Sequence, residues 1–265
     1  MDLKIAPLAE PFEFAGHDAP QLQIILLHGF TASPTEVEPL GKFLFEKSEK
    51  KFLIRSILLP GHGIAGRMGF KALDNVSYTD WISDCQSKIN KFATDYDCPI
   101  LIGGLSMGAL LTIITLHSSL ARDPKFIGGI LLSPALIIQS KIFNLVKYIK
   151  YIKKYQYKGQ ESEEFFKEHN LFSYHTRSLH ASDEFRKVNK IAKKDLKDVS
   201  KPMIAFVAEE DELVNVERTL KLLQENQFIE SHKITNMGHI FTVYPESQKI
   251  FDEIYQWIQE RLEKR

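Results

Sequence analysis

Short apolar runs alternate with longer stretches of helical period along most of the chain. Glycine, proline or charged residues bound the apolar runs, which lie at 24–27, 52–59, 100–102, 129–132 and 203–207. Such runs are typical of strands that are buried on both faces. The stretches of helical period lie at 35–48, 78–95, 107–120, 216–226 and 247–262. Strands that alternate with helices predict a mostly parallel, doubly wound sheet of the α/β class.

Residues 139–200 break this alternation, because they contain no good strand candidate and show much helical period. The segment holds 12 Lys and 2 Arg against 8 Asp and Glu, so 14 − 8 gives it an excess of six positive charges. Many aromatic residues accompany the lysines. We expect this segment to form a helical cap, inserted into a core that residues 1–138 and 201–265 build.

Composition limits the classes of function. A chain of 265 residues, 44% of them hydrophobic, can form a single domain with an insertion. Lys plus Arg and Asp plus Glu both number 34, so the chain lacks the net positive charge of a dedicated nucleic-acid binder. Neither a membrane-spanning apolar run nor the layout of a secretory signal is evident, so we expect a soluble, cytoplasmic protein. Cys85 and Cys98 are too few for a disulfide framework and lack the neighbours of a zinc site.

The strongest chemical signal is the pentapeptide Gly104-Leu105-Ser106-Met107-Gly108, which follows an apolar run and precedes a helical pattern. In this setting the motif predicts a sharp strand-to-helix turn that exposes the Ser106 hydroxyl as a nucleophile. Gly104 and Gly108 permit the turn, because side chains there would collide with the neighbouring strand and helix. The alternative is a glycine-rich turn in which the serine is incidental.

A serine nucleophile needs a base, and histidine, with an unperturbed pKa of about 6.5, exchanges protons near neutrality. His239 is our candidate, because it follows Gly238 in a loop between a short strand candidate at 233–235 and the final helix. The other histidines have simpler interpretations: His169, His175 and His180 as solvated cap residues, His117 as structural, and His28 and His62 as residues that shape loops near the site.

The acid that orients the histidine is expected in the loop Glu209-Glu210-Asp211-Glu212. We favour Asp211, because the apolar pair Leu213-Val214 would anchor the loop while the short aspartate side chain points inward. Glu210 is the main rival, and the remaining carboxylates fit a solvated loop tip. The order Ser106, Asp211, His239 is that of α/β-hydrolases and differs from the orders of chymotrypsin and subtilisin.

Attack on an ester carbonyl creates an oxyanion that backbone amides can stabilise. The amide of Met107, directly after the nucleophile, is one expected donor. The loop after the first buried strand, Leu27 to Thr31, should supply the other, and the amide of Phe30 is the natural candidate.

These segments, with His28-Gly29-Phe30, Pro60-Gly61-His62-Gly63 and Gly238-His239, resemble the serine carboxylesterase and monoacylglycerol lipase branch of the α/β-hydrolase superfamily. The likeness runs from about residue 21 to the last helix and weakens across the cap. It implies a hydrolase without cofactor or metal, with a Ser-His-Asp triad, oxyanion donors at Phe30 and Met107, and an acyl pocket under a helical cap. Dehalogenases and epoxide hydrolases of this fold use aspartate at the elbow, where this chain has Ser106.

The expected function is therefore that of a carboxylesterase that hydrolyses small-molecule esters with short to medium acyl chains. Alternatives are a monoacylglycerol lipase or lysophospholipase, an acyl thioesterase, or a hydrolase fold that has lost turnover and serves as a binding protein. Residues 141–158 add a basic amphipathic pattern. This pattern indicates either a cap helix packed on the body with its lysines in water, or a lid that makes weak contact with lipid surfaces.

Overall fold

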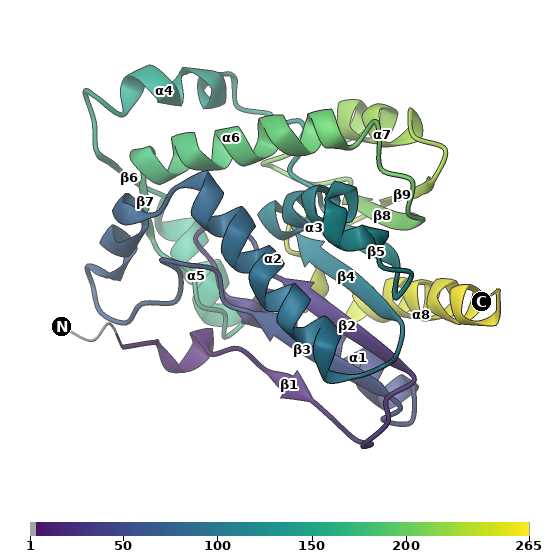
Figure 1. Cartoon of the computed structure of the whole chain (residues 1–265). Helices are drawn as coiled ribbons and strands as arrows, with labels where there is room; N and C mark the ends of the chain where they lie inside the picture. Colours follow the sequence, from purple (N-terminus) through teal and green to yellow (C-terminus); the bar gives the residue numbers. More distant parts are fainter. Residues whose placement is uncertain (1–3, 265) are drawn as a thin grey trace.

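A seven-stranded sheet forms the centre of the molecule in the computed structural model, which describes residues 4–264 (Figure 1). Its strands follow the order β1-β3-β2-β4-β5-β8-β9. All neighbouring pairs are parallel except β1 with β3. The strands are β1 (Glu13–Phe14), β2 (Leu22–Leu27), β3 (Phe52–Ile57), β4 (Ile100–Leu105), β5 (Phe126–Leu132), β8 (Met203–Ala208) and β9 (Ile229–Ile234). The predicted α/β class with a mostly parallel sheet is confirmed.

Helices cover both faces of this sheet, and each face has its own apolar core. One core joins the sheet to α2 (Tyr78–Asp95), α3 (Met107–His117), α6 (Leu179–Asp195) and α7 (Val216–Gln224). The other joins it to α1 (Glu38–Lys47) and α8 (Gln248–Glu263). Every residue of β2, β3, β4 and β8 is buried, as the apolar runs predict, although Arg55 and Ser56 interrupt the run of β3. The parallel strands thus end at one edge, where the loops with the candidate residues follow.

The 139–200 segment, which we call the cap segment, lies between β5 and β8. Besides α6 it contains α4 (Val146–Ile149) and α5 (Gln160–Glu168). α6 packs along α3, and α4 lies on α6 at the upper left of Figure 1. The cap segment also carries a two-stranded antiparallel hairpin, β6 (Tyr155–Tyr157) and β7 (Thr176–Ser178). The expectation that it lacks strands is wrong, because two runs of three residues are too short to leave a periodic signal.

Residues 141–158 also differ from the single amphipathic helix that their pattern suggests. A 3-10 helix at Lys141–Leu145 leads into the short α4, and the chain then turns into β6. Val146 is buried, but Ile142, Leu145 and Ile152 are exposed. The expectation that this apolar stripe packs on the body holds only in part.

The bounds of two other elements, β9 and α3, differ from those expected from the sequence. The strand candidate at 233–235 is the end of the longer β9, whose alternating burial on the sheet edge hid its first residues from a search for apolar runs. The helix expected at 107–120 ends at His117, where the Ser118 hydroxyl donates to the Thr115 carbonyl and a 3-10 turn follows.

Candidate active site

Ser106 occupies a sharp turn between β4 and α3. Its φ of 56° and ψ of −111° are unusual for a residue with a side chain, and its amide donates to the Leu132 carbonyl of β5 at 2.9 Å. The residue is 8% exposed. The next residue, Met107, begins α3, so Ser106 lies beside the free amides of a helix N-terminus. The structure therefore has the strand-turn-helix arrangement that the pentapeptide predicts.

Gly104 and Gly108 lie where backbones meet. A Cβ atom on Gly108 would overlap the Leu27 carbonyl oxygen, and one on Gly104 would overlap the backbone of Gly108. Only glycine allows α3 to start this close to β2 and β4. The two glycines are thus required by packing around Ser106.

His239 and Asp211 face each other at the same edge of the sheet. The Nδ1 atom of His239 lies 2.6 Å from Oδ2 of Asp211, although 28 residues separate them. His239 follows β9 and Asp211 follows β8, and these neighbouring parallel strands bring the two loops together. The Nε2 atom of His239 is buried and makes no hydrogen bond with another described residue.

The structure distinguishes Asp211 from its acidic neighbours. The Asp211 side chain is fully buried, whereas Glu209, Glu210 and Glu212 are exposed. Its Oδ1 atom accepts the amides of Leu213 at 2.8 Å and Val214 at 2.9 Å. Val214 is buried, as the loop-anchor argument requires, while Leu213 is exposed. The geometry therefore favours Asp211 over the rival Glu210.

The turn at residues 28–31 passes close to Ser106, and we call it the oxyanion turn because the sequence predicts the second oxyanion donor there. A Cβ atom on Gly29 would lie 3.3 Å from Cβ of Ser106, so Phe30 follows directly after the point of contact. The Phe30 ring stacks on Phe185 of α6 with centroids 5.1 Å apart and also contacts Trp81. The Phe30 side chain is thus held between the core and the cap segment, while its amide remains in the turn beside Ser106.

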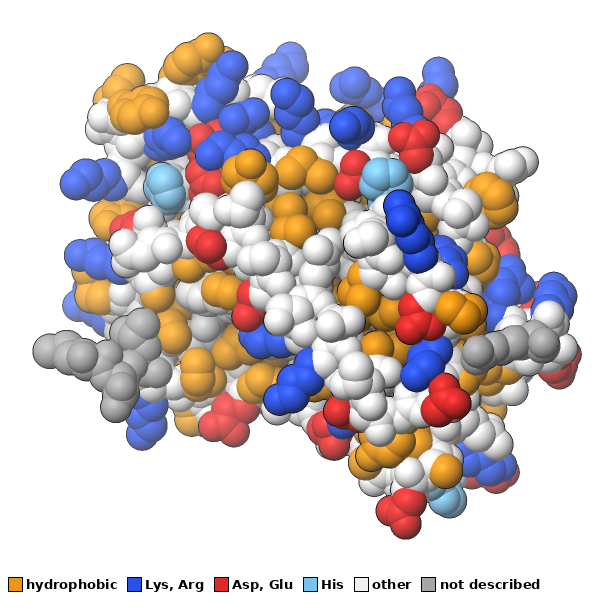
Figure 2. Space-filling model, in the orientation of Figure 1, with side chains coloured by type: hydrophobic (Ala, Val, Ile, Leu, Met, Phe, Trp, Pro, Cys, Tyr) orange, Lys and Arg blue, Asp and Glu red, His pale blue; other side chains and the backbone are white. Residues whose placement is uncertain are grey.

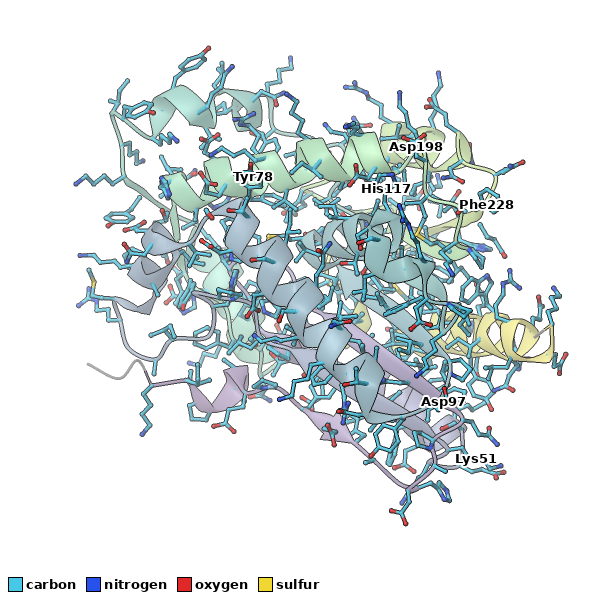
Figure 3. The ribbon with its side chains drawn as sticks, viewed as in Figure 1. Lys51, Tyr78, Asp97, His117, Asp198 and Phe228 are labelled. Atoms are coloured by element: carbon cyan, nitrogen blue, oxygen red, sulfur yellow. The ribbon has the colours of Figure 1, made fainter. Side chains whose placement is uncertain are left out.

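His28 and His62 are buried residues of neighbouring loops. The Nε2 atom of His28 accepts the Leu59 amide at 3.1 Å, and its ring packs against His62 with centroids 4.9 Å apart. Burial lowers the pKa of His28 to about 4 and that of His62 well below its usual value, so both rings are neutral near pH 7. His117 lies at the end of α3 (Figure 3), with Nδ1 3.5 Å from Oδ1 of Asp195.

Glu36, which is buried, and Lys158, which is partly buried, are two ionisable groups that the sequence did not single out. The Oε2 atom of Glu36 accepts the Gly29 amide at 2.9 Å. Burial raises the pKa of this carboxyl to about 7, although the hydrogen bond from Gly29 and the charge of His239 both act to lower it. Lys158 of the cap segment has its pKa lowered to about 7 by burial and by repulsion from Arg177. A glutamate in a helical start and a lysine in a basic segment leave no signal of burial in a single sequence.

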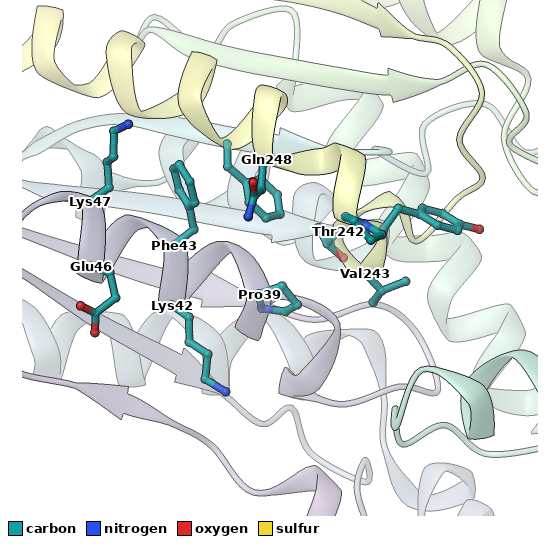
Figure 4. Close-up of a pocket in the computed structure, with 11 residues that line it drawn as sticks. Pro39, Lys42, Phe43, Glu46, Lys47, Thr242, Val243 and Gln248 are labelled. Atoms are coloured by element: carbon teal, nitrogen blue, oxygen red, sulfur yellow. The ribbon is translucent and has the colours of Figure 1, made fainter.

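Two hollows of the surface are lined by residues other than the candidate catalytic ones. One, of about 690 Å³, is lined by α1 and α8 residues such as Phe43 and Phe251 (Figure 4). Another, of about 1130 Å³, lies between residues 66–70 and the cap segment and includes Ser173 and Tyr174. Neither is lined by Ser106 or His239. Within residues 4–264, no group of three or more His, Cys, Asp or Glu side chains is placed to hold a metal ion, and no helix is long and apolar enough to span a membrane.

Comparison with known proteins gives one family. The family described as "Serine aminopeptidase, S33" matches residues 18–239. A carboxylesterase of Bacillus subtilis (strain 168) is 19% identical over 253 residues, which cover 94% of this chain and 96% of that protein.

Solved structures give the same fold. One, from a study of the metagenome-derived lipolytic enzymes LipS and LipT, has a TM-score of 0.80 at 18% identity and covers 97% of this chain and 100% of its own. The monoacylglycerol lipase of Paleococcus ferrophilus has a TM-score of 0.73 at 18% identity and covers 98% of this chain and 100% of its own. Identity this low shows a shared fold.

Proposed function

Because the chain belongs to the serine aminopeptidase S33 family, with an α/β-hydrolase fold, we propose that it hydrolyses carboxylic esters with short to medium acyl chains through an acyl-enzyme intermediate. One observation carries the proposal: a buried histidine-carboxylate pair, His239 and Asp211, lies at the sheet edge where Ser106 occupies a strained elbow. Among the relatives, the Bacillus protein is named a carboxylesterase.

In the proposed reaction, the Ser106 hydroxyl attacks the ester carbonyl carbon while Nε2 of His239 takes its proton. Asp211 fixes the ring with Nδ1 protonated and stabilises the cation that forms. The amides of Phe30 and Met107 donate to the oxyanion. The alcohol leaves with the proton from His239, and water then attacks the acyl-serine in the same way to release the acid. These steps use no cofactor.

The test compares the purified protein with its Ser106→Ala variant. We expect the wild type to hydrolyse p-nitrophenyl butyrate and the variant to lose nearly all of this activity, and a fluorophosphonate probe to label Ser106 in the wild type alone. An unchanged rate in the variant would overturn the proposal. Absence of both turnover and labelling would instead favour a binding protein without activity.

Substrate class is tested on matched compounds. A chain-length series of p-nitrophenyl esters, a monoacylglycerol, a lysophospholipid and an acyl thioester separate an esterase from the lipase and thioesterase alternatives. The family's name makes an amino-acid arylamide a necessary comparison. We expect the short and medium esters to give the highest kcat/KM.

We also propose that the cap segment makes weak contact with anionic lipid surfaces, because its outer end is both apolar and basic. Residues 139–159 contain six lysines and no acidic residue. Figure 2 shows apolar side chains gathered over α4 at the upper left, with lysines around them. Exposed apolar side chains on this end are Ile142, Leu145, Tyr148, Tyr151, which is 81% exposed, and Ile152, which is 91% exposed. An apolar surface ringed by lysines suits an anionic bilayer interface.

Co-sedimentation with vesicles tests this contact. We expect binding to phosphatidylglycerol vesicles that added salt weakens, and little binding to phosphatidylcholine alone. Ile152→Ser should reduce the bound fraction, whereas Phe228→Ser, at an exposed apolar residue next to β9, should not. Equal loss in both variants, or binding that ignores lipid charge, would contradict the proposal.

A further inference from the structure

The oxyanion turn is held at both of its ends by groups outside it. At its start, the Gly29 amide donates to Oε2 of Glu36. At its end, Thr31 has a φ of 68°, a left-handed conformation that a β-branched residue rarely adopts. Thr31 is only 2% exposed. Such a conformation persists only where surrounding contacts determine it, so the groups that bind Thr31 control the shape of the turn.

The groups that bind Thr31 come from the cap segment. Its carbonyl oxygen accepts the Tyr174 amide at 2.9 Å and the Ser173 hydroxyl at 3.2 Å. Its hydroxyl oxygen lies 2.6 Å from Nζ of Lys158, which also donates to Oγ of Ser173 at 2.7 Å. Lys158 thus sits at the centre of a small network that joins the cap segment to the end of the oxyanion turn.

The placement of Lys158 is energetically unusual for a lysine. Its ammonium is surrounded by two hydroxyl groups and, 5.3 Å away, by the Phe166 ring, and no carboxylate lies within ion-pair distance among the residues described. Arg177 adds repulsion, and Glu36 adds attraction. A partly buried cation without a paired anion costs stability. A residue that only stabilised the fold would be replaced here by an apolar side chain at little cost.

We propose that Lys158 is a positioning residue for the reaction: through Thr31 it holds the oxyanion turn so that the Phe30 amide points at the developing oxyanion. This inference rests on the proposed ester hydrolysis. Loss of one oxyanion donor typically lowers kcat about 10²–10³-fold, so a loosened donor should lower it about 10- to 100-fold. Substrate binding in the ground state does not need this donor, so KM should change little.

Two variants remove the contact from either side. Lys158→Met removes the ammonium and keeps the length of the side chain, and Thr31→Val removes the hydroxyl and keeps the β-branched shape. We expect both to lower kcat for p-nitrophenyl butyrate about 10- to 100-fold with a small change in KM. The kcat of the double variant should be no lower than that of the less active single variant, because both changes remove the same contact. Thr31→Ser, which keeps the hydroxyl, should retain most of the activity. Lys190→Met, at an exposed lysine of α6, is the matched control and should behave as wild type.

Hydrogen exchange of the amides at residues 28–31 provides a measurement that does not depend on turnover. We expect faster exchange in Lys158→Met and Thr31→Val than in wild type or Lys190→Met. The inference would be overturned if the two variants kept the wild-type kcat, or if their losses in kcat were additive in the double variant. The loss of activity in Ser106→Ala would still support the proposed function in that case. If the wild-type protein has no esterase activity, the proposed function fails, and unchanged exchange in the variants would overturn the positioning role separately.

Discussion

The carboxylate of Asp211 binds three groups at once, because Oδ2 lies 2.6 Å from Nδ1 of His239 while Oδ1 accepts the amides of Leu213 and Val214. In Asp211→Asn, the one remaining oxygen can still accept the amides of Leu213 and Val214, and the new amide group then turns an N–H toward Nδ1 of His239. We therefore expect His239 to lose its orientation and required tautomer, and kcat to fall about 10⁴-fold with the fold intact. Steady-state kinetics and near-ultraviolet circular dichroism measure both effects.

Glu210→Gln is the matched control for this change, because Glu210 is the adjacent acidic residue and is exposed. It should keep kcat within about threefold of wild type, as is usual for a surface substitution. If Glu210→Gln lowers kcat as much as Asp211→Asn does, the assignment of the acid role to Asp211 is wrong.

The start of α3 depends on close backbone contact, which predicts a strong effect of Gly108→Ala. The new Cβ atom would overlap the Leu27 carbonyl oxygen, so β2 and α3 must separate. We expect a loss of several kcal/mol in the free energy of unfolding, roughly the upper range for single substitutions. Urea denaturation measures it. Gly238→Ala, where the nearest atom is the Tyr244 hydroxyl at 3.6 Å, should cost less than about 1 kcal/mol.

The elements that could be predicted from the sequence are those in which one local pattern determines the structure. The buried runs at 24–27 and 203–207 lie within β2 and β8, and the glycines around Ser106 mark the elbow. The β6–β7 hairpin and the first residues of β9 were missed because short strands and an edge strand leave no unbroken apolar run.

The candidate site divides in the same way. His239 and Asp211 could be proposed because each lies in a loop after a strand candidate, and their chain order fits the fold. The role of Lys158 depends on a contact with Thr31 across 127 residues of chain, which a single sequence does not encode locally. Glu36 binds Gly29 only seven residues away, but its burial leaves no signal in a single sequence. The boundaries of the cap segment stay a prediction.

Tyr174 connects the cap segment to the loop that contains Gly61. Its hydroxyl donates to the Gly61 carbonyl at 3.0 Å and accepts the Ile64 amide at 2.8 Å, and burial raises its pKa to about 12. Tyr174→Phe leaves the Ile64 amide buried without its acceptor, so we expect a loss of about 1–3 kcal/mol in the free energy of unfolding. Tyr148→Phe, on the exposed outer end of the cap segment, should change it by less than about 0.5 kcal/mol. Equal unfolding midpoints for the two variants would contradict this role.

The buried carboxyl of Glu36 makes a prediction about pH and stability. Its pKa is about 7 in the folded protein against 4.5 for an unperturbed glutamate, with Gly29, His239 and Lys158 opposing the effect of burial. Between these values the folded state holds a proton that the unfolded state has released, so this group's contribution to stability falls as pH rises through this range. The expected loss is roughly 3 kcal/mol by the time pH exceeds the folded-state pKa.

Glu36→Gln isolates this contribution, since the amide oxygen can still accept from Gly29 and the side chain no longer titrates. His28, whose pKa is about 4 in the folded protein, acts in the opposite direction, because acidification below its usual pKa destabilises the fold. The pH profile of wild-type stability alone therefore mixes the two effects.

The difference in free energy of unfolding between Glu36→Gln and wild type cancels the effect of His28. This difference should shift in favour of the variant between about pH 5 and about pH 8. Urea denaturation at both pH values measures the shift, and a difference that stays constant would mean that Glu36 is ionised throughout and is held as a carboxylate by Gly29, His239 and Lys158.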